Sequence, residues 1–268
     1  MKTDYPSILV EQAGQVATIR IRHPKQPGGD IHWDLGAAFS ELRGHDAVRV
    51  IVLTGEHDGV FSLGPTTAQY RAAMEAPGTL TEPHRLWHTF TGLVRCHEAM
   101  AQIEKPIIAR VNGTVMGFAP AVMFGCDFII AREDAVVGDT HLALGALAPY
   151  GAPFGIVPGD GGMATAPLFL APPILKEYLM LNRTFTGREL AAMHLINRAV
   201  TPGELDATVD DFVRRLLARP AYALAWTRRV VNRRLVDQLN RTLDAGAAFE
   251  MVTFLQEERQ RFEDPMDL

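Results

Sequence analysis

Two runs of aliphatic residues, Val48–Leu53 and Ile107–Val111, constrain the fold of this chain more than any other feature. A strand with one face in water alternates apolar and polar side chains, but each of these runs is interrupted only by a single arginine. Such strands are typical of parallel sheets, whose two faces are covered by the helices of the crossover connections. Arg85–Ile103 lies between the runs and has helical periodicity. This order predicts an α/β fold.

The remaining pattern divides the chain into two parts. Ser7–Val10 and Val16–Ile21 predict an opening hairpin, and Phe128–Ala131 predicts a further strand. The last third has only helical patterns, at Pro202–Ala218 and Ala223–Gln260. We therefore expect an α/β core in residues 1–200 and a C-terminal helical segment in residues 201–268. The apolar face of this segment needs a partner surface, and a neighbouring subunit is one candidate.

Composition excludes several classes of protein. The chain has 268 residues, of which 47% are hydrophobic, and a formal net charge of −5. This supports one globular domain with a large core and lacks the clustered basic surface of a nucleic-acid-binding protein. No apolar run has the length of a membrane span. Cys96 and Cys126 are predicted to be buried free thiols, and with no signal peptide at Met1–Pro6 we expect a cytoplasmic protein.

One basic cluster has two interpretations. It is either the solvated face of a late helix or a rim that attracts an anionic substrate tail, such as a CoA phosphate. Its members are Arg228, Arg229, Arg233 and Arg234.

Three blocks of sequence carry a resemblance to a known superfamily. They are Val50-Ile-Val-Leu-Thr-Gly55 with Val60-Phe-Ser-Leu-Gly64, then Lys105–Gly113 with Met116–Ala119 and Cys126-Asp127, and then Gly155–Gly162. In this order they resemble the crotonase superfamily, which includes the enoyl-CoA hydratases and isomerases. The resemblance spans nearly the whole chain. It implies the crotonase (ClpP/crotonase-like) fold, a spiral of ββα units with C-terminal helices, and an enzyme that acts on a carbonyl substrate.

The second block predicts an oxyanion-binding turn. A buried strand followed by Asn112-Gly113 leads into a helix, and the N–H groups at a helix N-terminus are free to bind negative charge. In the superfamily one oxyanion donor is the backbone N–H at this turn, which corresponds to Phe118. The other corresponds to Pro65, which has no N–H. We place Phe118 and Gly64 at the expected hole, where a neighbouring N–H or side chain replaces the missing donor.

The two glutamates of the hydratases are also missing. One would lie six residues before Asp127, where this chain has Ala121. The other falls in a Gly-x-Pro-Glu-x-x-x-Gly pattern, which corresponds to Gly138–Gly145 and puts His141 in place of the glutamate. Hydration of an enoyl double bond needs a general acid and a general base close together. This chain does not offer that pair in the usual positions. Since the oxyanion hole of the superfamily holds a thioester oxygen, the donor missing at Pro65 disfavours chemistry on a CoA thioester.

His141 and Asp160 form a candidate general-base dyad instead. A carboxylate beside a histidine fixes the imidazole tautomer and stabilises the imidazolium that forms when the ring takes a proton. This pair resembles the β-diketone hydrolase branch of the superfamily, which uses no cofactor and no CoA. The resemblance implies that the dyad activates water, which attacks a carbonyl of a small ketone substrate and breaks a C–C bond in a retro-Claisen step.

Further residues are assigned to the site by the same resemblance. Trp33 corresponds to a tryptophan whose N–H could donate to an enolate oxygen, and Glu250 corresponds to a glutamate that orients the dyad histidine or shapes the pocket. Candidate substrate-binding residues are Trp87, His88 and Phe154. We expect no metal, because His84 and His88 share a helical face but have no third ligand nearby.

Three alternatives stay open at this point. The superfamily places the base nine residues before the aspartate, where this chain has Gly151; an insertion at residues 146–155 allows His141 to serve instead. A CoA-ester hydratase or isomerase with altered residues is the runner-up to a β-diketone hydrolase, with CoA entering only as part of that substrate. An inactive crotonase-fold binding protein is the third reading. The resemblance also implies a homotrimer or a dimer of trimers.

Overall fold

A computed structural model describes residues 2–23, 25–26, 28–64, 76, 82–142 and 155–253. The larger sheet has six strands in the order β1-β2-β3-β5-β7-β10. β1 and β2 form the predicted antiparallel hairpin, and from β2 to β10 all neighbours are parallel. The strands are β1 (Ile8–Ala13), β2 (Val16–Ile21), β3 (Val50–Gly55), β5 (Ile107–Val111), β7 (Phe128–Arg132) and β10 (Arg198–Val200). Every residue of β3 is buried, so the α/β prediction is confirmed.

A smaller sheet was not expected from the sequence. Its strands, in spatial order, are β4 (Gly59–Ser62), β6 (Gly113–Met116), β8 (Val136–Gly138) and β9 (Phe185–Thr186). β4, β6 and β8 are parallel, whereas β9 pairs with β8 in the antiparallel direction. These strands are too short to show an alternating pattern, which is why Gly113–Met116 reads as part of a turn in the sequence.

Asn112 joins the two sheets at the Asn-Gly corner between β5 and β6. Its side-chain oxygen accepts hydrogen bonds from the Thr54 hydroxyl and the Gly55 N–H at 3.1 and 3.0 Å. Its amide nitrogen donates to the carbonyl of His57 at 2.6 Å. A side chain at position 113 would collide with the backbone of Gly59, so the next residue has to be glycine. This corner sets the start of β6 and thereby the position of the turn after it.

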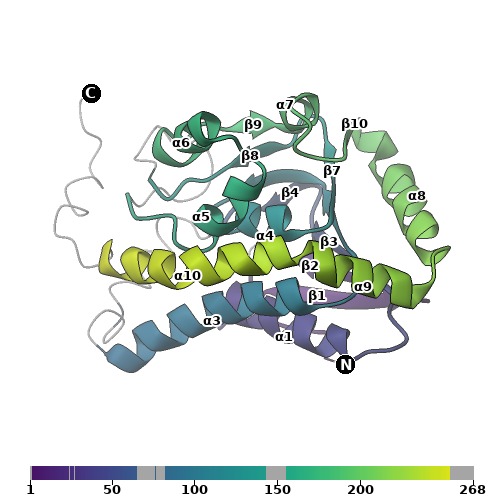
Figure 1. Ribbon diagram of the computed structural model, residues 1–268, viewed down its shortest axis with the longest axis horizontal. Coiled ribbons are helices and arrows are strands. Elements are labelled where there is room, and N and C mark those ends of the chain that lie inside the picture. The colour runs from purple at the N-terminus through teal and green to yellow at the C-terminus, as the bar shows by residue number, and fades with distance from the viewer. Residues whose placement is uncertain are drawn as a thin grey trace.

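Helices cover the sheets on several sides (Figure 1). α1 packs against α3, and α10 runs along α3 and also contacts α5. The helices are α1 (Ile31–Arg43), α3 (Pro83–Gln102), α4 (Ala119–Gly125), α5 (Gly162–Thr165), α6 (Pro172–Met180), α7 (Gly187–Ala192), α8 (Leu205–Leu217), α9 (Ala221–Val231) and α10 (Arg233–Thr253), with 3₁₀ turns at Ala166–Leu168 and Pro202–Glu204.

The C-terminal helices pack on the same chain. α8 lies against the larger sheet, where its buried Leu205 and Val209 join a cluster with Ile108. On α10, Leu239 and Leu243 are buried against α3, and each such side chain contributes about 1.5–3 kcal/mol of burial free energy. α10 therefore has a partner surface within its own subunit. The division at residue 200 stays a prediction.

The two cysteines and the possible membrane-spanning segments were also addressed by the sequence. Cys96 and Cys126 are free and buried, as predicted. Over the described part of the chain, no helix combines the length and the apolar character that a membrane crossing requires.

Candidate active site

The site forms where parallel strands of the smaller sheet end. β4, β6 and β8 are parallel neighbours, with Met116 of β6 beside Gly138 of β8. The carboxyl ends of parallel strands meet at one edge of a sheet, so the residues that follow them lie together. Here these residues are Gly64 after β4, Phe118 after β6 and His141 after β8. The sheet that the sequence did not predict is therefore the element that assembles the site.

A glycine-rich turn brings Asp160 to this edge. Gly161 has a φ of 112°, and a Cβ atom there would collide with Nε2 of the buried His97. Gly159 lies against α10, where a Cβ atom would be 2.8 Å from the Cβ of Glu250. The turn can approach α3 and α10 this closely only because both positions are glycine. Asp160 thus sits between two helices and is 4% exposed.

The structure brings His141 and Asp160 together. Nε2 of His141 lies 3.0 Å from Oδ2 of Asp160, and the histidine is 7% exposed. Nδ1 of the same ring lies 2.8 Å from Oδ1 of Asp139, a buried residue that the sequence analysis missed. Both ring nitrogens therefore face carboxylates. Gly151, the alternative position for the base, lies outside the described residues.

The charges of this pair follow from its surroundings. Burial alone would lower the pKa of His141, but the carboxylates of Asp160 and Asp139 raise that pKa well above its usual value. Burial would raise the pKa of Asp160, but the nearby His141 cation lowers it. Both shifts favour a protonated His141 ring beside an ionised Asp160 carboxylate.

Glu250 reaches the same region from α10 and is buried. Burial and the negative charge of Asp160 raise its pKa well above the usual value, which favours the protonated form of the side chain. Within the described residues its Oε2 has no hydrogen-bond partner. Both ring nitrogens of His141 face Asp139 and Asp160, so of the two roles assigned to Glu250 the shaping of the pocket is the one that stays a prediction.

The two turns of the expected oxyanion hole are neighbours. Phe118 is the N-cap residue of α4, and a Cβ atom at Gly117 would lie 3.9 Å from the Cα of Gly64. Ala121, at the position of the first hydratase glutamate, is buried inside α4. Pro65 lies outside the described residues, so the replacement for its missing donor stays a prediction.

Two further histidines line this region. Nε2 of His97 donates to the carbonyl oxygen of Asp160 at 2.8 Å, and burial lowers the pKa of His97, so this ring is neutral. His32 packs its ring edge to face against Phe118, with ring centroids 4.4 Å apart. His97 does not belong to a sequence motif. Its contact with the Asp160 turn joins residues that are far apart in the sequence, so the sequence alone does not predict it.

Trp33 is directed away from its expected role. Its indole N–H donates to the carbonyl oxygen of His88 at 3.2 Å, and its ring stacks on the His88 ring at 4.6 Å. The side chain from α1 that packs against Phe118 is His32 instead. Trp87 is 65% exposed, so substrate binding by Trp87 and His88 stays a prediction. Phe154 lies outside the described residues.

One group of described side chains has the composition of a metal site. Ligand atoms of Asp139, His141 and Asp160 lie within 4.8 Å of one another. A histidine binds a metal through a nitrogen that carries no proton, and the same nitrogen must point at the ion. Both nitrogens of His141 instead point at carboxylates at hydrogen-bond distance. The geometry fits a hydrogen-bonded ion array better than a metal centre.

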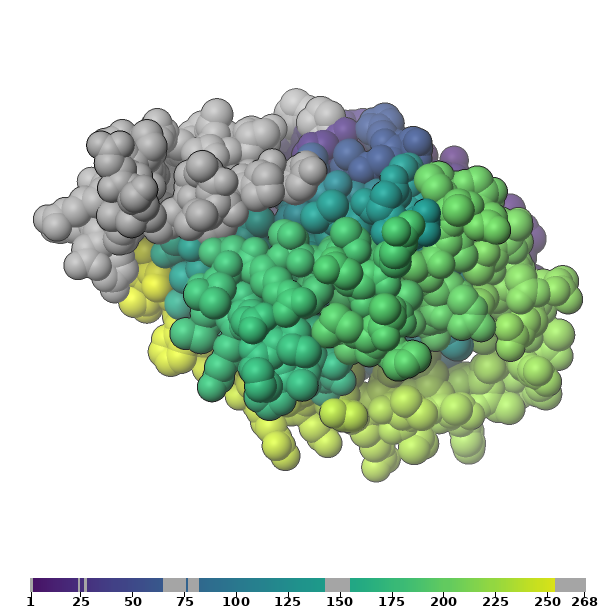
Figure 2. All heavy atoms as spheres, turned by 90° about the horizontal axis from the view of Figure 1, so that it is seen from above, coloured from purple at the N-terminus to yellow at the C-terminus, as the bar shows by residue number. Residues whose placement is uncertain are grey.

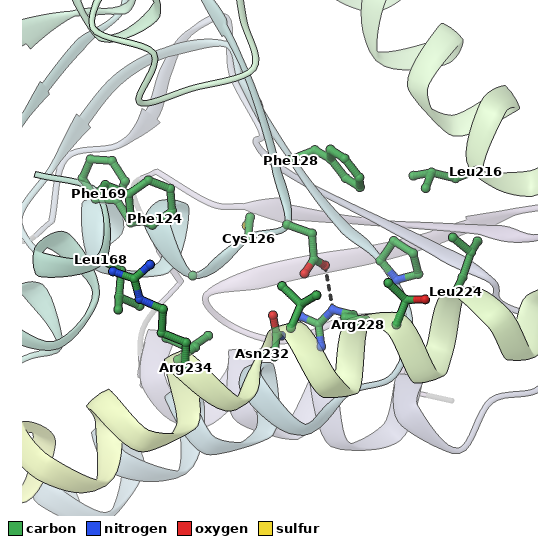
Figure 3. A pocket seen from close by; sticks show the side chains of 16 residues that line it. Phe124, Cys126, Phe128, Leu168, Phe169, Leu216, Leu224, Arg228, Asn232 and Arg234 are labelled. Atoms are coloured by element: carbon green, nitrogen blue, oxygen red, sulfur yellow. Dashed lines mark hydrogen bonds and ion pairs between the residues drawn. The ribbon is translucent and has the colours of Figure 1, made fainter.

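A cavity of about 380 Å³ lies elsewhere, between α9, α10 and the start of β7 (Figure 3). For one member of the basic cluster both interpretations are corrected, because Arg228 is 6% exposed and pairs with Asp127 at 2.6 Å. Arg229, Arg233 and Arg234 are exposed, as the solvated-face interpretation expects. Arg228 also donates to the backbone carbonyls of Met100 and Ile103. It is neither a solvated side chain nor free to attract a substrate, because β7 and α3 already use its donors.

Comparisons with known proteins place this architecture in a family. The sequence model of the enoyl-CoA hydratase/isomerase family matches residues 11–265. The chain belongs to this family and is an enzyme of the crotonase superfamily. It is 27% identical to a crotonyl-CoA hydratase of Syntrophomonas wolfei over 264 residues, which cover 96% of this chain and 93% of that protein. It is 29% identical to a carnitinyl-CoA dehydratase of Salmonella arizonae over 221 residues, or 82% and 77% of the two chains.

Solved structures share the fold. An enoyl-CoA hydratase/isomerase from Mycobacterium paratuberculosis superimposes with a TM-score of 0.82 at 22% identity, covering 96% of this chain and 97% of that one. A β-diketone hydrolase from the cyanobacterium Anabaena sp. PCC 7120, bound to (S)-3-oxocyclohexyl acetic acid, superimposes with a TM-score of 0.78 at 22% identity, covering 93% and 94%. The crotonase fold predicted from the sequence is confirmed.

Proposed function

We propose that this enzyme hydrolyses a carbon–carbon bond of a β-diketone in a retro-Claisen reaction that needs no cofactor. The observation that supports it is the 3.0 Å contact between Nε2 of His141 and Oδ2 of Asp160 in the protein interior. This pair replaces the two glutamates of a hydratase, because Ala121 and His141 stand at their positions. The fold accommodates such a reaction, since one solved structure that shares it is named a β-diketone hydrolase.

The proposed reaction begins when the His141–Asp160 pair takes a proton from water. The hydroxide attacks one carbonyl carbon, and the resulting alkoxide is bound at the turn of Phe118 and Gly64. The C–C bond then breaks, and its electron pair passes to the carbon between the two carbonyls as an enolate. The proton taken from water returns to this carbon. One water is consumed, and the products are a carboxylic acid and a ketone.

A panel of monocyclic and bicyclic β-diketones tests this proposal. We expect loss of the diketone and appearance of one keto acid, with turnover reduced about 10²–10⁴-fold in His141→Gln, because this change breaks the His141–Asp160 pair that takes the proton and general-base catalysis contributes that factor. Glu104→Gln, between α3 and β5, where the carboxylate pairs with Arg229 of α9, serves as the matched control. A panel left unchanged by purified protein would remove the basis of the proposal.

Hydration or dehydration of an acyl-CoA is the second candidate. The names of the relatives favour it, since a crotonyl-CoA hydratase and a carnitinyl-CoA dehydratase are similar to this chain over most of its length. An enzyme of this kind binds acyl-CoA, and a bound ligand raises the melting temperature. A concentration-dependent increase with crotonyl-CoA, but not with diketones, would decide for this candidate.

A binding protein without activity is the third reading. Separation of His141 from Asp160 would have supported it. The two side chains are instead in hydrogen-bond contact and buried, which is an arrangement that costs free energy unless the charges are paired.

A further inference from the structure

His141 is held from both sides in the described structure. Nδ1 lies 2.8 Å from Oδ1 of Asp139, and Nε2 lies 3.0 Å from Oδ2 of Asp160. Oδ1 of Asp139 also accepts the backbone N–H of His141 at 3.0 Å. One carboxylate oxygen thus fixes both the turn after β8 and the ring that the turn carries. A catalytic histidine with a single carboxylate partner keeps its other nitrogen free for a proton, and this one does not.

We propose that Asp139 is a positioning residue that holds His141 as a cation between two carboxylates, and that Oδ1 of Asp160 accepts the proton from water. The identity of the acceptor rests on the proposed hydrolysis. The role of Asp139 rests on geometry alone, because it describes the enzyme before any substrate binds.

The free oxygen of Asp160 is the second observation. Oδ1 of Asp160 is buried and, within the described residues, has no hydrogen-bond partner, whereas Oδ2 faces His141. An unpaired buried carboxylate oxygen costs free energy, so its retention points to a group that it meets during the reaction. Glu250 contributes another unpaired buried oxygen, Oε2. A protonated Glu250 can donate to the water whose proton Asp160 accepts.

The net charge of the array is compatible with either His141 or Asp160 as the proton acceptor, so the acceptor is assigned from the geometry. The titratable groups that act on this array come from several elements: Asp139 after β8, Asp160 before α5, Glu250 on α10, His97 on α3, His32 on α1 and Tyr178 on α6. With Glu250 and His97 neutral, the Asp139–His141–Asp160 array carries one net negative charge before it takes a proton and none afterwards. A neutral histidine paired with one carboxylate also has one negative charge and can also take up one proton. Only the atom at which the proton enters differs.

The ionisation of His141 can be measured without a substrate. In protein labelled with ¹⁵N-histidine, we expect the His141 ring to show two protonated nitrogens at pH 7. In Asp139→Asn the amide oxygen can still accept the Nδ1 hydrogen bond, but the charge is gone, so the ring should lose its second proton at a lower pH than in the wild type. Asp134→Asn, an exposed aspartate paired with Arg132, should leave the ring unchanged.

Activity provides the second readout. Asp139→Asn should shift the pH profile of kcat in the same direction as the ring titration and lower kcat at pH 7 by about tenfold or more, whereas Asp139→Glu should restore part of both. Asp160→Asn should lose activity at every pH. A neutral His141 ring in the wild type at pH 7 overturns the proposal, even if Asp139→Asn does not fold. Failure to hydrolyse diketones leaves the spectra readable, so the two proposals fail separately.

Discussion

Nε2 of His97 and the carbonyl oxygen of Asp160 are 2.8 Å apart, so a buried histidine on α3 anchors the turn that carries the carboxylate of the candidate site. The contact is close because Gly161 follows Asp160 with a φ of 112° and no side chain. Position 161 therefore links the local backbone conformation to the geometry of the site.

Gly161→Ala should destabilise the protein more than Gly14→Ala, although both glycines have a positive φ. The added Cβ meets the His97 ring and also forces a backbone conformation that L-residues avoid, so we expect a loss of about 2–4 kcal/mol. Gly14→Ala is the control, because Gly14 has a φ of 57° and no atom within 4 Å of an added Cβ. It should cost about 1–2 kcal/mol. Urea unfolding measures the free energy of unfolding of both variants. Equal losses would show that the His97 ring moves aside for the added Cβ at little cost.

Arg228 and its sequence neighbour Arg229 should differ strongly in their contribution to stability. Arg228→Met leaves Asp127 and two backbone carbonyls without their donor in the interior, and we expect a loss of about 3–5 kcal/mol. Arg229 pairs with Glu104 at the surface, with 69% of its side chain exposed, so Arg229→Met should cost less than about 1 kcal/mol. Chemical denaturation of the two variants compares them directly, and similar losses would contradict the described burial.

Glu250→Gln should change how stability depends on pH. The pKa of Glu250 is raised in the folded state, so the stability contributed by this group is present below about pH 4.5 and is lost as the pH rises toward the folded pKa. Glutamine does not titrate. The melting temperature of Glu250→Gln relative to the wild type should therefore increase from pH 4.5 to pH 8.

Glu189 provides a control of opposite sign. Hydrogen bonds from the backbone N–H and hydroxyl of Thr186 lower its pKa, so its contribution is present above about pH 4.5 and is lost on acidification. Glu189→Gln should be less stable than the wild type at pH 7, and the difference should shrink as the pH falls. A Glu250→Gln difference that is flat with pH would show that Glu250 is ionised in the folded enzyme.

We propose that another copy of this chain covers the outer face of α9, in the homotrimer or dimer of trimers that the superfamily resemblance implies. Tyr222, Trp226 and Val230 are 83%, 70% and 64% exposed and recur every four residues, so they share one face of the helix. Side chains of α9 and α10 project along one edge of the molecule (Figure 2). Large exposed apolar patches of this kind are typical of interfaces.

Light scattering during size-exclusion chromatography measures the assembly. The wild type should have the molar mass of three or six chains, and Trp226→Glu should shift it toward one chain. Glu98→Gln, on the exposed part of α3, is the control that should not change it. A monomeric wild type would contradict the proposal.

Part of the fold could be predicted because the pattern is local. β3 and β5 are recognisable since every position of a doubly covered strand is apolar, and the opening hairpin is recognisable from its two flanking runs. The smaller sheet could not be predicted, because strands of two to four residues show no periodicity.

The candidate site was predictable only where a residue type marks the chemistry. His141 and Asp160 could be paired because each stands at a position that the superfamily uses. His97 acts through a contact with Asp160, which is distant in the sequence. Asp139 acts through the turn that follows a strand of three residues. Neither residue lies in a recognisable sequence pattern. Trp33 matches the expected position, but its N–H reaches the His88 carbonyl, and only the packing of α1 on α3 determines this.

Hydrolysis of a β-diketone in H₂¹⁸O shows whether the enzyme adds water to a carbonyl carbon and breaks the adjacent C–C bond. Mass spectrometry of the products should show one ¹⁸O atom in the new carboxyl group, cleavage of the bond beside the attacked carbonyl, and neither product with Asp160→Asn. The account would be contradicted if the diketones are recovered intact while crotonyl-CoA gains one ¹⁸O as a hydroxyl group, because the His141–Asp160 pair would then serve a hydratase.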